Sequence, residues 1–134
     1  MMTVDSARAA MKAYLDAVAA HGQFAEYFTE DVVLQVVGTD QTARGRQAVE
    51  GTIRYLQEQA FDGRPEVKSV LVDGDRAALE ADFVGRHIGE FAGKAATGRE
   101  VRVPCTIIYD LAGDRIKAFR IYGFMEELQR QLEG

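Results

Sequence analysis

The sequence predicts an α+β fold built on a largely antiparallel sheet. Helical periodicity with a single β-rich segment dominates before Pro65, and strand patterns dominate after it. Segregation of this kind is typical of α+β domains, since α/β folds alternate the two elements. The chain has 134 residues, the usual length of one domain, and contains neither repeats nor a dividing linker. Residues 1–134 are therefore expected to form a single domain.

Helices are predicted in four places. Residues 6–20 carry apolar side chains at three- and four-residue spacings, which give one apolar face. A short helical turn follows around residues 24–28. A second long amphipathic helix opens after Gly45, and a short last helix has Met125 and Leu128 on one side.

Strand patterns explain most of the remaining chain. A β-rich run covers residues 32–37, and a further run ends at Asp73-Gly74, a strong hairpin signal. In the next segment, apolar side chains alternate with charged ones, as in a half-buried strand. Five strands are thus predicted at residues 32–37, 67–72, 76–87, 99–111 and 115–122.

Composition excludes several classes of function. With 16 Lys and Arg against 21 Asp and Glu, the net charge is −5, which argues against a nucleic-acid-binding protein. Apolar runs are too short for a membrane span or a signal-peptide core. A single cysteine excludes an intrachain disulfide, and two isolated histidines make a metal site improbable. A cytoplasmic protein without metal or cofactor is expected.

Apolar side chains occur on both faces of the last two strands. Ile116, Ala118 and Tyr122 share one face, whereas Phe119 and Ile121 share the other. A sheet covered by helices on one side needs only one apolar set, so the second predicts contact with another subunit. Because symmetric dimers are the commonest oligomers, we expect a homodimer through the outer face of the sheet.

A glycine-rich motif follows the central strand. It reads His-Ile-Gly-Glu-Phe-Ala-Gly at residues 87–93 and Ala-Thr-Gly-Arg-Glu-Val at residues 96–101. This pattern of a strand-end His, Gly, aromatic and Gly before a Thr-Gly-Arg turn resembles the SnoaL-like polyketide cyclases, within the nuclear transport factor 2-like superfamily. The resemblance implies a cone: a strongly curved mixed or antiparallel sheet around three helices, enclosing an apolar pocket.

The resemblance implies catalytic roles for two residues. His87 corresponds to the family histidine that works with a pocket aspartate to enolise a substrate carbon, a task suited to imidazole. Tyr14 lies on the first helix, about where steroid-isomerase relatives place a tyrosine that stabilises an enolate oxygen. The structural alternatives are a His87 that hydrogen-bonds within the core or at the pocket rim, and a Tyr14 that packs in the apolar stripe.

The acid that would pair with His87 has no counterpart in this sequence. The strand after the Thr-Gly-Arg turn contains no carboxylate from Val101 to Ile107, and Phe124 stands where relatives commonly have Asp. On the first strand, Gln35 stands where steroid-isomerase relatives have their base. Every acid and base pair of the superfamily is therefore incomplete.

Two polar residues of the last strand are expected inside the pocket. Arg120 and Tyr122 share the parity of Ile116, which we assign to the inner face. An unpaired buried arginine is costly. Arg120 therefore either faces a polar group of the ligand or pairs with a structural carboxylate, for which the candidates are Asp31, Asp110 and Glu126.

Cys105 alternates with apolar residues and is expected in the pocket wall as a small hydrophobe. A nucleophilic role would need a nearby cation or helix N-terminus. Cys105 is one of seven residues that we predict to bind substrate. The set is Gln35, Phe83, Val103, Cys105, Arg120, Tyr122 and Phe124.

Two functions fit these observations. The first is a cofactor-independent enzyme of the cyclase, aldol or isomerase type, which moves protons on a small hydrophobic carbonyl or polyketide-like compound. The alternative is a non-catalytic protein that binds a small hydrophobic ligand in the same pocket. A third reading is a dimeric scaffold whose outer sheet face is the active surface.

Overall fold

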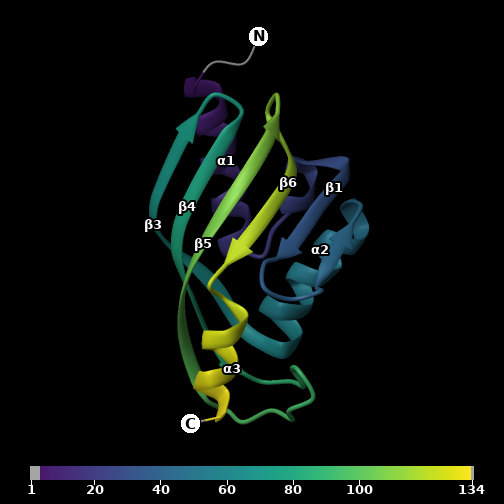
Figure 1. Ribbon diagram of the computed structural model, residues 1–134, viewed down its shortest axis with the longest axis vertical. Helices are drawn as coiled ribbons and strands as arrows, with labels where there is room; N and C mark the ends of the chain where they lie inside the picture. The colour runs from purple at the N-terminus through teal and green to yellow at the C-terminus, as the bar shows by residue number, and fades with distance from the viewer. Residues whose placement is uncertain (1–3, 134) are drawn as a thin grey trace.

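The computed structural model describes residues 4–133 and contains one six-stranded sheet with three α-helices (Figure 1). A 3₁₀ turn, η1, and a π-helical turn, η2, complete the set. In chain order the elements are α1 (Val4–Ala19), η1 (Phe24–Tyr27), β1 (Phe28–Val36), β2 (Thr42–Arg44), α2 (Arg46–Arg54), η2 (Tyr55–Ala60), β3 (Phe61–Asp73), β4 (Arg76–His87), β5 (Glu100–Ala112), β6 (Arg115–Tyr122) and α3 (Met125–Glu133).

The sheet has the strand order β2-β1-β6-β5-β4-β3. All neighbours are antiparallel except β1 and β6, which run parallel, so the sheet is mixed. In Figure 1, α1 and α2 lie behind the sheet, and α3 follows the end of β6 and lies beside the beginning of β5. The predicted α+β class is confirmed, with one face of the sheet covered by helices.

The main differences from the sequence prediction lie at element boundaries. The strand β1 begins at Phe28 rather than at residue 32, because the charged Glu30 and Asp31 interrupt its apolar pattern. The edge strand β3 begins at Phe61 rather than at residue 67, because an edge position tolerates the Pro65 that obscures the strand pattern. The long second helix changes from α2 into the π-helical turn η2 at Tyr55. The three-residue strand β2 was not predicted, since its sequence is short and flanked by polar residues.

Two facing glycines, Gly63 in β3 and Gly85 in β4, lie beside the ring of Phe83. Gly63 and Gly85 are register partners. A Cβ atom on Gly63 would lie 2.7 Å from the Cζ atom of Phe83, and one on Gly85 would lie 2.8 Å from the Cα atom of Gly63. Only glycine therefore fits at these two positions, where the Phe83 ring rests on the strand.

Buried side chains form two clusters on the inner face of the sheet. The first core joins α1 and η1 to β1 and the adjoining parts of β4, β5 and β6; its largest members are Met11, Tyr14, Phe24, Phe28, Leu79, Tyr109 and Phe119. The second core lies beneath α3 and contains Ala60, Phe61, Phe83, Phe91, Val101, Val103, Phe124, Leu128 and Leu132.

A β-bulge in β6 reverses its alternation. Asp110 and Leu111 are adjacent in β5, but their partners in β6 are Ala118 and Ile116, so Lys117 is an extra residue. Ile116 faces inward before the bulge, and Phe119 is buried after it. The inner face of β6 therefore changes parity at Lys117.

The outer face of the sheet carries two ionic clusters. At one, Arg102 bridges Glu66 and Asp82 at 3.0 and 2.9 Å. At the other, Arg120 contacts Asp110 at 2.9 Å. Less polar side chains lie between them, including Pro104, Thr106, Ile108 and Tyr122.

No helix within residues 4–133 has the length and apolar character that crossing a bilayer requires. The expected cytoplasmic location stays a prediction.

Candidate functional site

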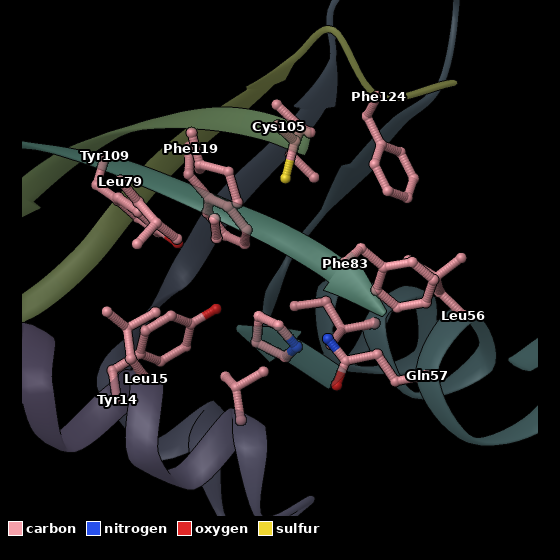
Figure 2. A pocket seen from close by; sticks show the side chains of 16 residues that line it. Tyr14, Leu15, Leu56, Gln57, Leu79, Phe83, Cys105, Tyr109, Phe119 and Phe124 are labelled. Carbon is pink, nitrogen blue, oxygen red and sulfur yellow. The ribbon is translucent and has the colours of Figure 1, made fainter. Parts of the chain in front are cut away.

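A cavity of about 80 Å³ lies where the two cores meet (Figure 2). A buried water molecule needs roughly 10–15 Å³ of such volume, so the cavity has room for several. It is smaller than a pocket for a drug-sized ligand. The lining comes from α1, α2, η2, four strands and the connection between β6 and α3. Its residues are Tyr14, Leu15, Val18, Ile53, Leu56, Gln57, Pro65, Leu79, Ala81, Phe83, Cys105, Ile107, Tyr109, Phe119, Ile121 and Phe124.

Two tyrosines contribute hydroxyl groups to this cavity. Tyr14 comes from α1 and Tyr109 from β5; their ring centroids lie 6.1 Å apart in an edge-on arrangement. Both side chains are buried, and burial raises the pKa of each phenol. Neither hydroxyl makes a hydrogen bond to another residue within 4–133. Figure 2 shows the Tyr14 hydroxyl directed into the cavity, so it can donate to a ligand.

Gln57 is the third polar group of the lining. It lies in η2 and is 7% exposed. Its Oε1 atom is buried and has no hydrogen-bond partner among the described residues. A buried amide without a partner is costly, so Gln57 is an unusual choice for a position on the inward side of this helix.

Cys105 lies in the cavity wall on β5, as predicted from its alternation. Burial raises the pKa of its thiol to about 11, with a smaller contribution from the Asp82 carboxylate. The thiol therefore remains protonated near neutral pH and acts as a small apolar group.

No carboxylate, histidine, lysine or arginine is found among the described residues that line the cavity. Between residues 4 and 133, no three His, Cys, Asp or Glu side chains come together as a possible metal site. The polar chemistry of the cavity thus rests on two phenols, one amide and one thiol.

His87 lies outside this lining, at the far end of β4. It is fully buried in the second core, where its ring stacks on Phe61 with centroids 5.1 Å apart. Phe61 in turn contacts Phe83, which lines the cavity, at 5.5 Å. Two aromatic rings therefore separate His87 from the cavity.

The hydrogen bonds of His87 fix its tautomer. The backbone N–H of Thr97 donates to Nδ1 at 3.2 Å, and the Thr97 hydroxyl lies 3.0 Å from the same atom. In the neutral ring, the proton is consequently on Nε2, which is buried without a partner in the described chain. The structure thus matches the predicted alternative of a histidine hydrogen-bonded within the core.

The rest of the His-Gly-aromatic motif packs in the same region. Phe91 contacts Phe61 edge-on at 5.4 Å. A Cβ atom on Gly89 would lie 2.3 Å from the carbonyl oxygen of Gln59, so this glycine permits the loop to approach η2. The motif therefore builds the second core and its covering loop.

Three residues predicted inside the pocket face outward instead. Arg120 and Tyr122 follow the bulge at Lys117, which turns them to the outer face. Arg120 forms the ion pair with Asp110 that was one of its predicted alternatives. Gln35 is exposed and is the register partner of Arg120, so it lies on the same face. Their predicted inward placement is wrong.

The other predicted residues divide between the cavity and the second core. Tyr14, Phe83, Cys105 and Phe124 line the cavity, whereas Val103 is fully buried in the second core.

Sequence reasoning missed Tyr109 and Gln57. Tyr109 shares the parity of Cys105 along β5, and Gln57 follows Leu56 on the inward side of the second helix. These spacings were available in the sequence, but a tyrosine and a glutamine in such patterns do not distinguish a cavity wall from an ordinary core.

A mixed sheet that packs its inner face on helices around a cavity defines a class of small α+β domains. The sequence profile of the SnoaL-like polyketide cyclase family matches residues 8–132, nearly the whole chain. The chain belongs to this family. A search of curated proteins found no match.

Solved structures show the same fold at low sequence identity. The putative SnoaL-like polyketide cyclase from Jannaschia sp. CCS1 is 18% identical, with a TM-score of 0.85 over 97% of this chain and 93% of that one. AclR, a putative hydroxylase from Streptomyces galilaeus, is 20% identical, with a TM-score of 0.81 over 98% of both chains. The putative ketosteroid isomerase from Kribbella flavida is 19% identical, with a TM-score of 0.66 over 87% of this chain and 76% of that one. The three names differ in the reaction they give, and a shared fold does not by itself imply a shared reaction.

Proposed function

We propose that this protein binds a small apolar compound through a carbonyl oxygen in the cavity between the two cores. The observation that carries the proposal is the pair of Tyr14 and Tyr109 hydroxyls, which lack partners within residues 4–133 in an otherwise apolar lining. A carbonyl oxygen accepts hydrogen bonds, and the rest of such a ligand would bury apolar surface.

The two phenols suit this role because they stay protonated. Burial raises the pKa of both, so each remains a donor across the working pH range. Donors placed in an apolar site also polarise a carbonyl and favour negative charge on its oxygen. The site therefore supports binding directly and supports enolate formation if a base reaches the ligand.

Binding of short and cyclic ketones tests the proposal. In NMR titrations we expect 2-pentanone and cyclohexanone to shift resonances of the lining residues, with the smaller ketone favoured by the 80 Å³ volume. Tyr14→Phe and Tyr109→Phe should each weaken binding about tenfold, the effect of one lost hydrogen bond in a dry site.

Tyr27→Phe is the matched control, since Tyr27 contacts Tyr14 but does not line the cavity. It should leave the affinity unchanged. Absence of binding to the wild-type protein, or equal affinities in all three variants, would contradict the proposal.

A second candidate function is a cofactor-independent proton-transfer enzyme of the cyclase, aldol or isomerase type, with His87 as the base and Tyr14 holding the enolate oxygen. One observation favours it: the Nε2 atom of His87 is buried without a partner in the described chain, so it is free to exchange a proton with a ligand. Because the Thr97 N–H donates to Nδ1, Nε2 carries the ring proton, and it can act as a base only after the ring changes tautomer and gives up that hydrogen bond. Reaching a ligand would require Phe61 and Phe83 to move aside, because both rings lie between His87 and the cavity.

Deuterium exchange at the carbon beside the carbonyl tests this candidate. If His87 is the base, wild-type protein should accelerate exchange of cyclohexanone in D₂O, and His87→Gln should abolish the acceleration while ketone binding persists. Exchange no faster than buffer, together with normal binding, would leave only the binding function.

We also propose that two copies of the chain pair through the outer face of the sheet. Support comes from the less polar strip containing Pro104, Ile108 and Tyr122 between the two ionic clusters. Tyr122 is 40% exposed in the single chain. Sedimentation should give a dimer, and Ile108→Glu should shift it to monomer. A monomeric wild-type protein at high concentration would rule out this arrangement.

A further inference from the structure

Gln57 has a feature that the carbonyl site does not explain. Its Oε1 atom has no hydrogen-bond partner among residues 4–133, although the residue is only 7% exposed. An apolar side chain of similar shape at this position would avoid the cost of burying an amide. The neighbours on the same side of the helix, Ile53, Leu56 and Ala60, are all apolar.

The local backbone also distinguishes this position. Gln57 lies in the π-helical turn η2, and π-helical turns are rare and frequent at functional sites. Leu56 and Gln57 both reach the lining from this turn. In Figure 2 the Gln57 amide enters the lining from η2, on a different side from the Tyr14 hydroxyl on α1.

From the unpartnered amide and its place opposite the phenols, we infer that Gln57 is a second polar anchor, and that the ligand carries a hydroxyl group in addition to its carbonyl oxygen. This inference rests on the proposed carbonyl site. A hydroxyl both donates and accepts, so it can satisfy either the oxygen or the nitrogen of the amide. The ligand class is therefore a small apolar hydroxy ketone.

Matched ligands separate this inference from simple ketone binding. The compounds 4-hydroxy-2-butanone and 2-pentanone differ only by a hydroxyl in place of a terminal methyl group. The ring pair 4-hydroxycyclohexanone and 4-methylcyclohexanone differs in the same way over a longer span. In an apolar cavity without a second anchor, the methyl compound binds more tightly, because its burial removes no hydroxyl from water.

We expect wild-type protein to bind the hydroxy ketone of at least one pair about tenfold more tightly than the methyl compound. The reason is that the methyl compound would leave the buried Gln57 amide without a hydrogen-bond partner. Gln57→Met should reverse the order, so that the methyl compound binds more tightly. The matched control is Gln59→Met, in the same turn but exposed, which should keep the wild-type preference.

The side-chain amide resonances of Gln57 give a readout that needs no variant. They should shift with the hydroxy ketone and much less with its methyl analogue. If wild-type protein prefers both methyl compounds and its ketone binding still depends on Tyr14, the inference about Gln57 is overturned and the carbonyl site stands. If no ketone or hydroxy ketone binds, both fail together.

Discussion

The cavity and the second core both bury polar groups among apolar side chains, but the surroundings of these polar groups differ. In the cavity, the hydroxyls of Tyr14 and Tyr109 border open volume. In the second core, His87 is held by Thr97 on one edge and stacked on Phe61, and it does not line the cavity. The first arrangement can be completed by a ligand, whereas the second is completed by the protein itself except at Nε2.

The family motif and the cavity therefore lie in different parts of the fold. The His-Gly-aromatic motif contributes His87 and Phe91 to the second core, and both contact Phe61. In the structure the motif builds the wall behind the cavity. The groups that face the cavity come from other elements and carry no motif.

Removing the ring of Phe61 is expected to have the largest effect, because this ring joins His87, Phe83 and Phe91. Phe61→Ala should lower the free energy of unfolding by about 3–5 kcal/mol, the usual cost of emptying a buried aromatic site. Urea denaturation measures it, with exposed Leu71→Ala as the control near zero. A loss below about 1 kcal/mol in the free energy of unfolding would contradict close packing around the Phe61 ring.

The Thr97 contact tests how firmly His87 is held. Thr97→Val removes the hydroxyl that lies 3.0 Å from Nδ1 and that accepts from the backbone N–H of Arg99 at 3.2 Å. We expect a loss of about 1 kcal/mol in the free energy of unfolding and a changed imidazole resonance of His87 in NMR spectra. The affinity for ketones should not change. A changed affinity would show that the second core and the cavity are coupled.

Asp110 provides a comparison on the outer face, away from both regions. The Arg120 guanidinium holds the pKa of Asp110 below its usual value, with Arg76 assisting. The stabilisation that the Asp110 carboxylate gives the fold is therefore fully present above a pH of about 3.9, the pKa of Asp in an unfolded chain. It is lost as the pH falls through the lower pKa that Asp110 has in the folded protein. Asp110→Asn should cost on the order of 0.5 kcal/mol at pH 7 and much less near pH 2. An equal cost at both pH values would exclude the ion pair as its source.

The smallest effect on stability is expected from the cavity itself. Tyr109→Phe removes a hydroxyl that has no partner within residues 4–133, so the free energy of unfolding should stay within about 0.5 kcal/mol of wild type. Thermal melts without ligand measure this, and melts with 2-pentanone should show the variant losing part of the ligand's stabilisation. A clear destabilisation without ligand would reveal a structural hydrogen bond at this hydroxyl.

The sequence predicted the fold class well because its signals are local. The Asp73-Gly74 hairpin, the alternation along β4 and the bounds of β6 all appear in the structure. The parity of β6 was not predictable in the same way. A bulge at Lys117 depends on how two strands pair, and nothing in the residues from Arg115 to Tyr122 marks it.

The candidate site was only partly predictable for a related reason. Tyr14, Phe83, Cys105 and Phe124 follow from periodicity, which gives the inner face. Periodicity does not say where that face leaves a void, because a void depends on the fit of side chains from five or more elements. His87 has the correct parity, yet lies four residues beyond Phe83, about 13 Å along the strand.

The bulge at Lys117 also decides which side chains reach the cavity. If Lys117 paired regularly in the ladder, alternation in β6 would continue unbroken, and Arg120 and Tyr122 would replace Phe119 and Ile121 on the side that borders the cavity. Deletion of Lys117 would instead remove the bulge and leave Phe119 and Ile121 facing inward. The conformation of one residue thus separates an apolar chamber from one that holds an arginine.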